Sequence, residues 1–207
     1  MSSLYERYIL PHVIGCACGA PPIRALRAKI VPQATGKVLE LGIGGGLNLA
    51  FYDAARVSSV TGVDPSEALR AKAAAAPRSA GLRVEILDGL GEALPFDDAS
   101  FDTAVCTFTL CSVDSPEAAL LEARRVLKPG GKLLFSEHGL APDIGVRRWQ
   151  YRLEPFWKPF AGGCHLTRSA GALIEAAGFR LGDLDGKYLR SLPRFLGWSE
   201  CGMALRD

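Results

Sequence analysis

A glycine-rich segment between two short apolar runs constrains this chain more than any other feature. The first run, at 38–41, is too short for a helix and ends at Gly42, which is typical of a parallel strand buried on both faces. Glycines at 42, 44, 45 and 46 permit backbone conformations and a close ligand approach that side chains would prevent. Apolar residues at 47–54 predict a helix next, and 59–63 predicts a second strand.

Asp64 ends this second strand and indicates what the glycine turn binds. Because the carboxyl ends of parallel strands lie at one edge of the sheet, Asp64 is positioned to accept hydrogen bonds from both hydroxyls of a ribose. A dinucleotide fingerprint needs glycine or alanine where Leu47 stands, and Glu40 would repel a pyrophosphate while suiting a cationic ligand. The segment predicts a nucleoside site; the alternative is a bare turn between strand and helix.

The E-x-G-x-G-x-G spacing from Glu40 to Gly46 resembles motif I of the class I S-adenosylmethionine-dependent methyltransferases of the type 11 domain. The sequences SFD at 100–102 and ARRVLKPGG at 123–131 are similar to landmarks of the same family, so the resemblance covers nearly the whole chain. It implies a Rossmann-like α/β fold with a seven-stranded, mostly parallel sheet, helices on both faces and an antiparallel last strand. It also implies S-adenosyl-L-methionine as cofactor and S-adenosyl-L-homocysteine as product.

The resemblance places the adenine ring against the loop at 88–96. The aspartate that often meets the adenine amino group falls on Leu90, so we expect the Gly91 backbone and apolar contacts to hold the ring, with Asp88 as the alternative. The strand predicted at 100–107 ends beside the cofactor. The expected cofactor-binding residues are Glu40, Gly42, Gly44, Gly46, Asp64, Pro65, Leu90, Gly91, Glu92, Cys106 and Thr107.

The rest of the pattern completes the expected fold. Helices are predicted at 65–77, 115–127 and 169–177, and further strands at 82–87 and 132–136, the last entered by a turn at 128–131. Two antiparallel strands at 181–189 and 195–205 should close the sheet. We expect one domain over 1–207, with a helical cap at 1–35, a cofactor-binding core at 36–138, a substrate lid and last helix at 139–178, and C-terminal strands at 179–207.

Five shorter segments are similar to the methyltransferase-like 7 proteins, membrane-associated enzymes that methylate alkyl thiols and sulfide. They are VCTFTLCSV at 105–113, EH at 137–138, WQ at 149–150, EPFW at 154–157 and GCHLTR at 163–168. This likeness implies a small-molecule acceptor, with S-methylation of a thiol or sulfide as the favoured reaction. The N-terminal hydrophobic anchor of those proteins has no counterpart in this sequence, so we expect a soluble, cytoplasmic relative.

Methyl transfer to sulfur is an in-line displacement, so the protein must align a thiolate with the methyl group and exclude water. A free thiol has a pKa of about 8.5, and a nearby base raises its thiolate fraction at neutral pH. His138 is the candidate base, oriented by Glu137; the alternative is a pair that only shapes the cofactor pocket. The aromatic region at 139–168 is expected to form a lid over the substrate. The alternative is a helix that only covers the edge of the sheet. Its candidate substrate contacts are Trp149, Trp157, His165 and Arg168.

Composition narrows the classes of partner. With 24 basic and 22 acidic residues and a net charge of +2, the chain shows no basic run that could follow phosphates, so we expect no nucleic-acid partner. No apolar stretch reaches the roughly 18 residues that span a bilayer. The six cysteines show no repeated C-x-x-C pairing, so no metal is expected. The alternative for Cys106, Cys111 and Cys164 is methyl relay or arsenic binding.

Two other classes of function stay open. The general motifs also fit methylation of a quinone ring carbon, a lipid amine or another small metabolite. A protein that binds the cofactor but has lost catalysis would carry the same glycines and the same Asp64. The sequence gives no signature of the oligomeric state.

Overall fold

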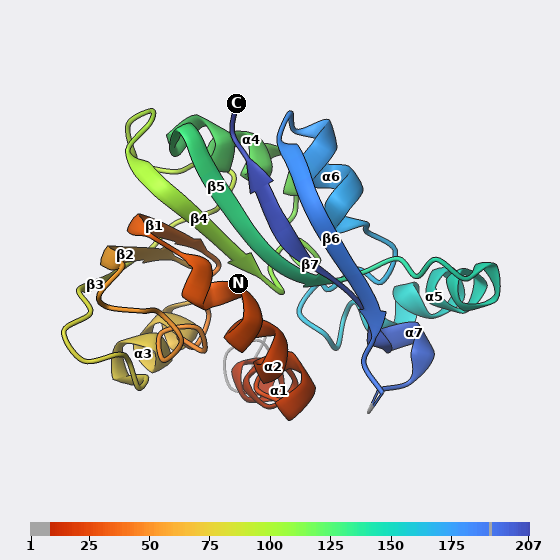
Figure 1. Ribbon diagram of the computed structural model, residues 1–207. Helices are drawn as coiled ribbons and strands as arrows, with labels where there is room; N and C mark the ends of the chain where they lie inside the picture. Colours follow the sequence, from red (N-terminus) through yellow and green to blue (C-terminus); the bar gives the residue numbers. More distant parts are fainter. Residues whose placement is uncertain (1–8, 191) are drawn as a thin grey trace.

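The computed structural model describes residues 9–190 and 192–207, which form a seven-stranded sheet in the order β3-β2-β1-β4-β5-β7-β6 (Figure 1). The strands are β1 (Gly36–Leu41), β2 (Val57–Val63), β3 (Val84–Leu87), β4 (Phe101–Thr107), β5 (Leu127–His138), β6 (Arg180–Tyr188) and β7 (Trp198–Leu205). Neighbouring strands pair in parallel from β3 to β5, whereas β7 runs antiparallel to both β5 and β6. The predicted fold class, including the antiparallel last strand, is confirmed.

Helices cover both faces of the sheet, and the alternation of strand side chains explains why. On β4, Ala104 and Cys106 pack in one core with α4 (Pro116–Val126) and α6 (Ala170–Ala176), while Val105 packs in a second core with α2 (Pro21–Ile30). Because β1, β4 and β5 contribute to both cores, these central strands are apolar on both faces.

Three of the predicted helices begin at a serine cap. The Oγ of Ser66 accepts from Leu69 N at 3.3 Å, which starts α3 (Glu67–Ala75), and Ser115 and Ser169 do the same for α4 and α6. Serine caps stabilise helices because they satisfy backbone N–H groups that lack a partner in the first turn. The helices predicted at 65–77, 115–127 and 169–177 are therefore confirmed, with shorter bounds.

The remaining helices lie at the two ends of the chain and in the insert after β5. They are α1 (Leu10–Cys18), the 3-10 helix η2 (Val31–Gln33), α5 (Ile144–Trp157) and α7 (Arg194–Gly197). Residues 1–8 of the expected cap lie outside the described residues, and the division of the chain into cap, core, lid and C-terminal strands stays a prediction. Across residues 9–190 and 192–207, no helix combines the length and hydropathy that crossing a bilayer requires.

The helix predicted at 47–54 is wrong, because this segment is a succession of turns. Leu49 N donates to Gly46 O at 3.1 Å and Phe51 N to Asn48 O at 2.9 Å, which are hydrogen bonds between residues three apart. The Asn48 side chain is buried and hydrogen-bonded to Glu40. Tertiary contacts of a polar side chain therefore override the apolar pattern that favoured a helix.

The predicted turn at 128–131 is also wrong, because it belongs to β5. The strand starts at Leu127, and its pairing with β4 shifts between Phe101 opposite Leu127 and Thr103 opposite Lys132. Gly130 has φ +74° and its N–H donates to Arg206 O at 2.7 Å. The glycines therefore form an irregular part of the strand rather than a connection before it.

Gly46 and Gly130 offer a matched test of crowding, because both have φ +74°. A Cβ at Gly46 would lie 2.8 Å from Ala76 Cβ, whereas one at Gly130 would meet nothing within 4 Å. Gly130→Ala should lower the free energy of unfolding by about 1–2 kcal/mol through backbone strain alone. Gly46→Ala should cost about 1–3 kcal/mol more through overpacking. Denaturant unfolding measures both, and equal losses would show that crowding at Gly46 is absent.

Candidate functional site

A cavity of about 310 Å³ opens at the carboxyl ends of β1, β2 and β4. This is the edge at which open parallel sheets bind ligands. Of the expected cofactor-binding residues, those that line it are Gly42, Gly44, Asp64, Pro65, Leu90, Gly91, Glu92 and Cys106. Glu40, Gly46 and Thr107 are not among the residues that line it.

The glycine turn and Asp64 form one hydrogen-bonded wall of this cavity. Asp64 Oδ2 accepts from Gly44 N and Oδ1 from Ser66 N, each at 2.9 Å. Burial raises the pKa of the Asp64 carboxyl, and the two backbone N–H groups partly offset this effect. Gly42 has φ +62°, and a Cβ there would lie 2.6 Å from the Thr109 side chain. Glycine is therefore required where the turn passes the loop after β4.

Leu90 and Gly91 form the wall at which adenine was expected. Leu90 is 54% exposed although it lines the cavity, so its side chain is open to a ligand. Asp88, the alternative adenine contact, lies outside the lining residues and pairs with Arg70 at 2.7 Å. Glu92 Oε1 accepts from Ser115 N at 3.3 Å, which ties the loop to the start of α4.

Glu40 and Thr107 lie behind the glycine turn in a buried polar network. Asn48 Nδ2 donates to Glu40 Oε1 at 2.9 Å and Tyr52 Oη to Glu40 Oε2 at 2.7 Å. Arg27 of α2 donates to Asn48 Oδ1 at 2.7 Å and to Thr107 Oγ1 at 2.6 Å. Both carboxylate oxygens of Glu40 are thus satisfied within the protein. Burial raises the pKa of Glu40 to about 7, although Tyr52 and Arg27 oppose the rise.

The sequence interpretation missed Arg27, Asn48 and Tyr52. One signal was present: a buried acid needs polar partners, and Asn48 and Tyr52 are the polar residues nearest after the glycines in an otherwise apolar stretch. No local pattern indicates Arg27, because it reaches Thr107 across 80 positions of sequence.

Glu137 and His138 end β5 but contact different groups. Glu137 Oε1 accepts from Thr109 N at 2.8 Å and Leu110 N at 3.2 Å, so this buried carboxylate holds the loop after β4. His138 Nε2 lies 2.7 Å from Cys164 Sγ. Glu137 does not orient the His138 ring by a hydrogen bond, because successive side chains on a strand point to opposite faces.

His138 belongs to a cluster that the spacing of cysteines did not indicate. Cys111 Sγ, Cys164 Sγ and a ring nitrogen of His138 all lie within 4.8 Å of one another. Cys111 is buried, and His138 and Cys164 are partly buried. The three side chains come from the loop after β4, the end of β5 and the segment after α5, so only the tertiary structure brings them together.

The aromatic insert contributes less to the cavity than expected. Trp149 is 57% exposed and lines a separate groove with Arg194 and Phe195. Trp157 at the end of α5 is partly buried and does not line the cavity. Gly162 does line it, together with Ile14 of α1. The part of the insert at the cavity is therefore the segment that follows α5, not the helix itself.

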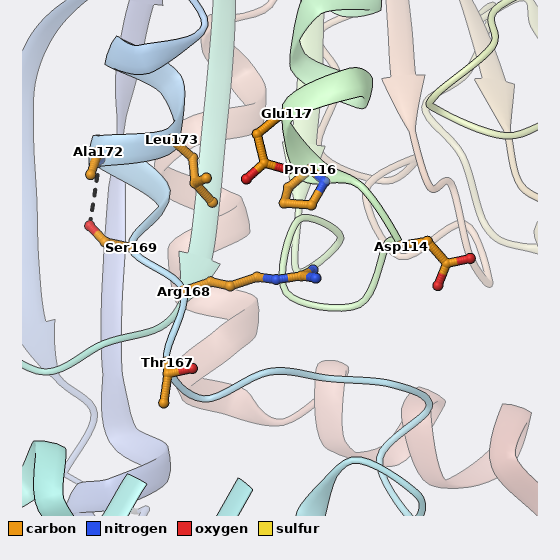
Figure 2. A pocket seen from close by; sticks show the side chains of 8 residues that line it. All are labelled: Asp114, Pro116, Glu117, Thr167, Arg168, Ser169, Ala172 and Leu173. Carbon is orange, nitrogen blue, oxygen red and sulfur yellow. Dashed lines mark hydrogen bonds between the residues drawn. The ribbon is translucent and has the colours of Figure 1, made fainter. Parts of the chain in front are cut away.

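His165 and Arg168, the other expected substrate contacts, both interact with other parts of the protein. His165 Nδ1 lies 3.1 Å from Glu154 Oε1. Arg168 donates to Leu110 O and Val113 O, both at 2.7 Å. Figure 2 shows Arg168 reaching from the start of α6 toward the loop before α4, beside a second cavity of about 370 Å³. Asp114 lines both cavities, so Arg168 fixes the loop that lies between them.

Comparisons with known proteins agree with this geometry. A family model described as a methyltransferase domain matches residues 39–135. The thiol S-methyltransferase TMT1B of Rattus norvegicus is 44% identical over 148 residues, which are 69% of this chain and 59% of that protein. The chain thus spans about three fifths of the length of that relative. A phosphatidylethanolamine N-methyltransferase of Cereibacter sphaeroides is 37% identical over 147 residues, 70% of each chain.

A solved methyltransferase structure is also similar to this chain over most of its length. The S-adenosylmethionine-dependent methyltransferase from Methanosarcina mazei is 27% identical, with a TM-score of 0.65, and the match covers 90% of this chain and 97% of that one.

The raised pKa of Glu40 predicts a pH-dependent stability. The ordinary pKa is 4.5 and the folded value is about 7, so the folded state retains a proton that the unfolded state has lost. Stability contributed by this proton is fully present below pH 4.5 and is lost as the pH rises through about 7. Glu40→Gln should remove this fall, so the free energy of unfolding of the wild type should decline relative to the variant over that interval.

Urea unfolding on both sides of this pH interval measures the effect. Glu85→Gln, which removes an exposed carboxylate from β3, is the control and should follow the wild type. If the free energies of unfolding of the wild type and of Glu40→Gln changed equally over this pH interval, the prediction would be contradicted.

Proposed function

The chain belongs to the class I S-adenosylmethionine-dependent methyltransferases, and on this premise we propose that it transfers a methyl group from S-adenosylmethionine to a small thiol or sulfide. The observation that carries the choice of acceptor is the 44% identity with a thiol S-methyltransferase. The cavity at the carboxyl edge of the sheet supports the choice of cofactor.

The residues of the cavity fit S-adenosylmethionine. Gly42 and Gly44 present backbone without a Cβ, and Leu90 and Gly91 offer apolar surface and backbone to the adenine ring. Each oxygen of Asp64 accepts one backbone N–H, and a carboxylate has about four lone-pair sites, so acceptor capacity remains for the ribose hydroxyls. When bound, the cofactor supplies an electrophilic methyl group on a sulfonium.

The glycine turn and Asp64 position the nucleoside part, while Glu40 acts through the turn rather than by contact. Because Glu40 binds Asn48 and Tyr52, it fixes the segment that follows the glycines. We assign Gly46 and Thr107 the same indirect role, since Thr107 belongs to this network and Gly46 packs against Ala76 of the α3 C-terminus.

We assign His138 as the base that takes the proton of the acceptor thiol. Its Nε2 lies 2.7 Å from Cys164 Sγ, so the His138 imidazole already contacts a sulfur atom at hydrogen-bond distance. An acceptor thiol needs such a contact to release its proton. Glu137 positions the neighbouring loop and is not in contact with the ring.

The wall that we propose to exclude water is formed by α1 and the segment after α5. Ile14 and Gly162 line the cavity, and a Cβ at Gly162 would lie 3.3 Å from both Ile14 and Leu10. This packing closes the cavity beside the acceptor, and a closed site keeps the thiolate poorly hydrated and reactive. His165 and Arg168 support this wall through Glu154 and the loop after β4. We propose this wall, rather than α5, as the lid.

Methylation of an amine on a lipid-like molecule is the second candidate function. The observation that favours it is the match to a phosphatidylethanolamine N-methyltransferase, which covers 70% of that protein. A panel of acceptors separates the candidates: sulfide and short alkyl thiols, phosphatidylethanolamine, phenols and a quinone precursor, each with labelled S-adenosylmethionine. Turnover on thiols and sulfide alone supports the proposal. Turnover only on the amine would replace it, and cofactor binding with no turnover would favour a non-catalytic protein.

Asp64→Asn should weaken cofactor binding. The amide replaces one acceptor oxygen with a donor, and hydrogen bonds to a charged group contribute about 1.5–3 kcal/mol each. We expect the Kd for S-adenosylhomocysteine, measured by calorimetry, to rise at least about tenfold. Asp88→Asn is the control, because Asp88 lies outside the cavity and pairs with Arg70. An unchanged Kd for Asp64→Asn would remove Asp64 from the cofactor site.

His138→Ala should lower kcat for thiol methylation by about 100-fold, which is the lower range for loss of a catalytic acid or base. The Kd for S-adenosylhomocysteine should stay within about twofold, because His138 does not line the cofactor cavity. His12→Ala, an exposed histidine on α1, is the matched control. Unchanged turnover of His138→Ala at neutral pH would exclude His138 from the mechanism.

A further inference from the structure

We propose that Cys111, His138 and Cys164 form a three-ligand zinc site beside the cofactor cavity. Cys111 lies in the loop after β4, His138 at the end of β5 and Cys164 in the segment after α5. Neighbours of these residues reach the cavity: Leu110 and Ser112 line it, as does Gly162. The cluster therefore lies directly behind the cavity wall that the loop after β4 and the segment after α5 form.

The separations of the donor atoms suit a zinc ion. Cys111 Sγ, His138 nitrogen and Cys164 Sγ all lie within 4.8 Å of one another, and His138 Nε2 and Cys164 Sγ are 2.7 Å apart. Zinc–sulfur bonds of about 2.3 Å and zinc–nitrogen bonds of about 2.0 Å place tetrahedral ligands about 3.5–3.8 Å apart. The His138–Cys164 pair is closer than this and must open by about 0.8 Å, and no pair is more than 4.8 Å apart, so small side-chain rotations bring the three donors to one ion.

The types of donor atom also select zinc. Two thiolates and one imidazole are soft to borderline ligands, which favour zinc over magnesium or calcium. As the ion binds, each cysteine forms a zinc–sulfur bond and releases its thiol proton to solvent. The two thiolate charges balance the charge of Zn²⁺, so the occupied site carries no net charge in its partly buried position.

The backbone around the cluster is already fixed. His165 N donates to Cys111 O at 2.7 Å, which joins the two cysteine-bearing segments. On the two sides of Cys111, Glu137 accepts from the N–H groups of Thr109 and Leu110, and Arg168 donates to the carbonyls of Leu110 and Val113. Metal sites need supports of this kind, because ligands that must first be ordered bind more weakly.

Three protein ligands leave a fourth tetrahedral position open, which is typical of catalytic zinc. We assign the sulfur of the acceptor to that position, an assignment that rests on the proposed function. A thiol bound to zinc loses its proton outright at neutral pH, so the ion would supply the thiolate that the imidazole alone was assigned to produce.

Zinc binding tests the site without any turnover. The chain is stripped of metal in a phosphine reductant, which adds no thiol, and titrated with Zn²⁺ against a chromophoric chelator. We expect one tightly held zinc per chain. Cys111→Ser, Cys164→Ser and His138→Gln should each weaken the affinity about 100-fold or more, because even loss of an outer hydrogen-bond partner of a ligand costs about 10–100-fold.

Cys201→Ser is the matched control, because Cys201 is a buried cysteine on β7 outside the cluster. Thermal unfolding and the Kd for S-adenosylhomocysteine verify that each variant is folded. Cys164→Ser keeps the test decisive if Cys111→Ser fails to fold, since Cys164 is only partly buried. A wild type without stoichiometric zinc, or cluster variants that bind zinc as the wild type does, would overturn the site.

Cobalt replaces zinc to test the fourth position. The Co²⁺ form should show the intense visible bands of tetrahedral thiolate coordination, and a short alkyl thiol should shift them. Bands that stay unchanged would overturn the assignment of the acceptor and leave a structural zinc. Zinc binding together with absent thiol methylation would instead contradict only the proposed function.

Discussion

The buried carboxylate of Glu40 is the group around which the ligand edge of this protein is arranged. A charged or polar group without partners is costly in the interior, so Glu40 requires the hydroxyl of Tyr52 and the amide of Asn48. Asn48 in turn requires Arg27 of α2. The network therefore joins the N-terminal helices, β1 and the segment after the glycines, and it holds that segment in turns where the apolar pattern alone would favour a helix.

The loop after β4 depends on the same kind of interaction. Glu137 accepts two of its N–H groups, Arg168 donates to two of its carbonyls, and Thr109 packs against Gly42. One face of this loop closes the cofactor cavity and Cys111 on the same loop meets His138 and Cys164. A single fixed loop thus connects the cavity proposed for the methyl donor with the cluster of Cys111, His138 and Cys164.

The comparisons and the geometry address different levels of function. Family membership follows from the matches to methyltransferases, and it implies the fold and the cofactor. Family membership does not fix the acceptor, since relatives of this chain include enzymes named for thiols and for a phospholipid amine. The Cys111, His138 and Cys164 cluster is the site at which we propose that a sulfur acceptor binds.

The resemblance to a family implied the seven-stranded sheet with its antiparallel last strand. The sequence by itself determined the residue ranges of most strands, the serines at which three helices begin and the position of Asp64 beside the glycines. These features depend on short-range patterns: period-two burial, capping residues and glycine spacing, each of which acts within a few positions. Only the tertiary structure decided that Glu40 is hydrogen-bonded to Asn48 and Tyr52, that Glu137 and His138 contact different groups, and that two cysteines from distant segments meet one histidine. The reason is physical: a buried polar group takes whatever partner the packing of remote segments brings within about 3 Å, and no local pattern encodes that distance.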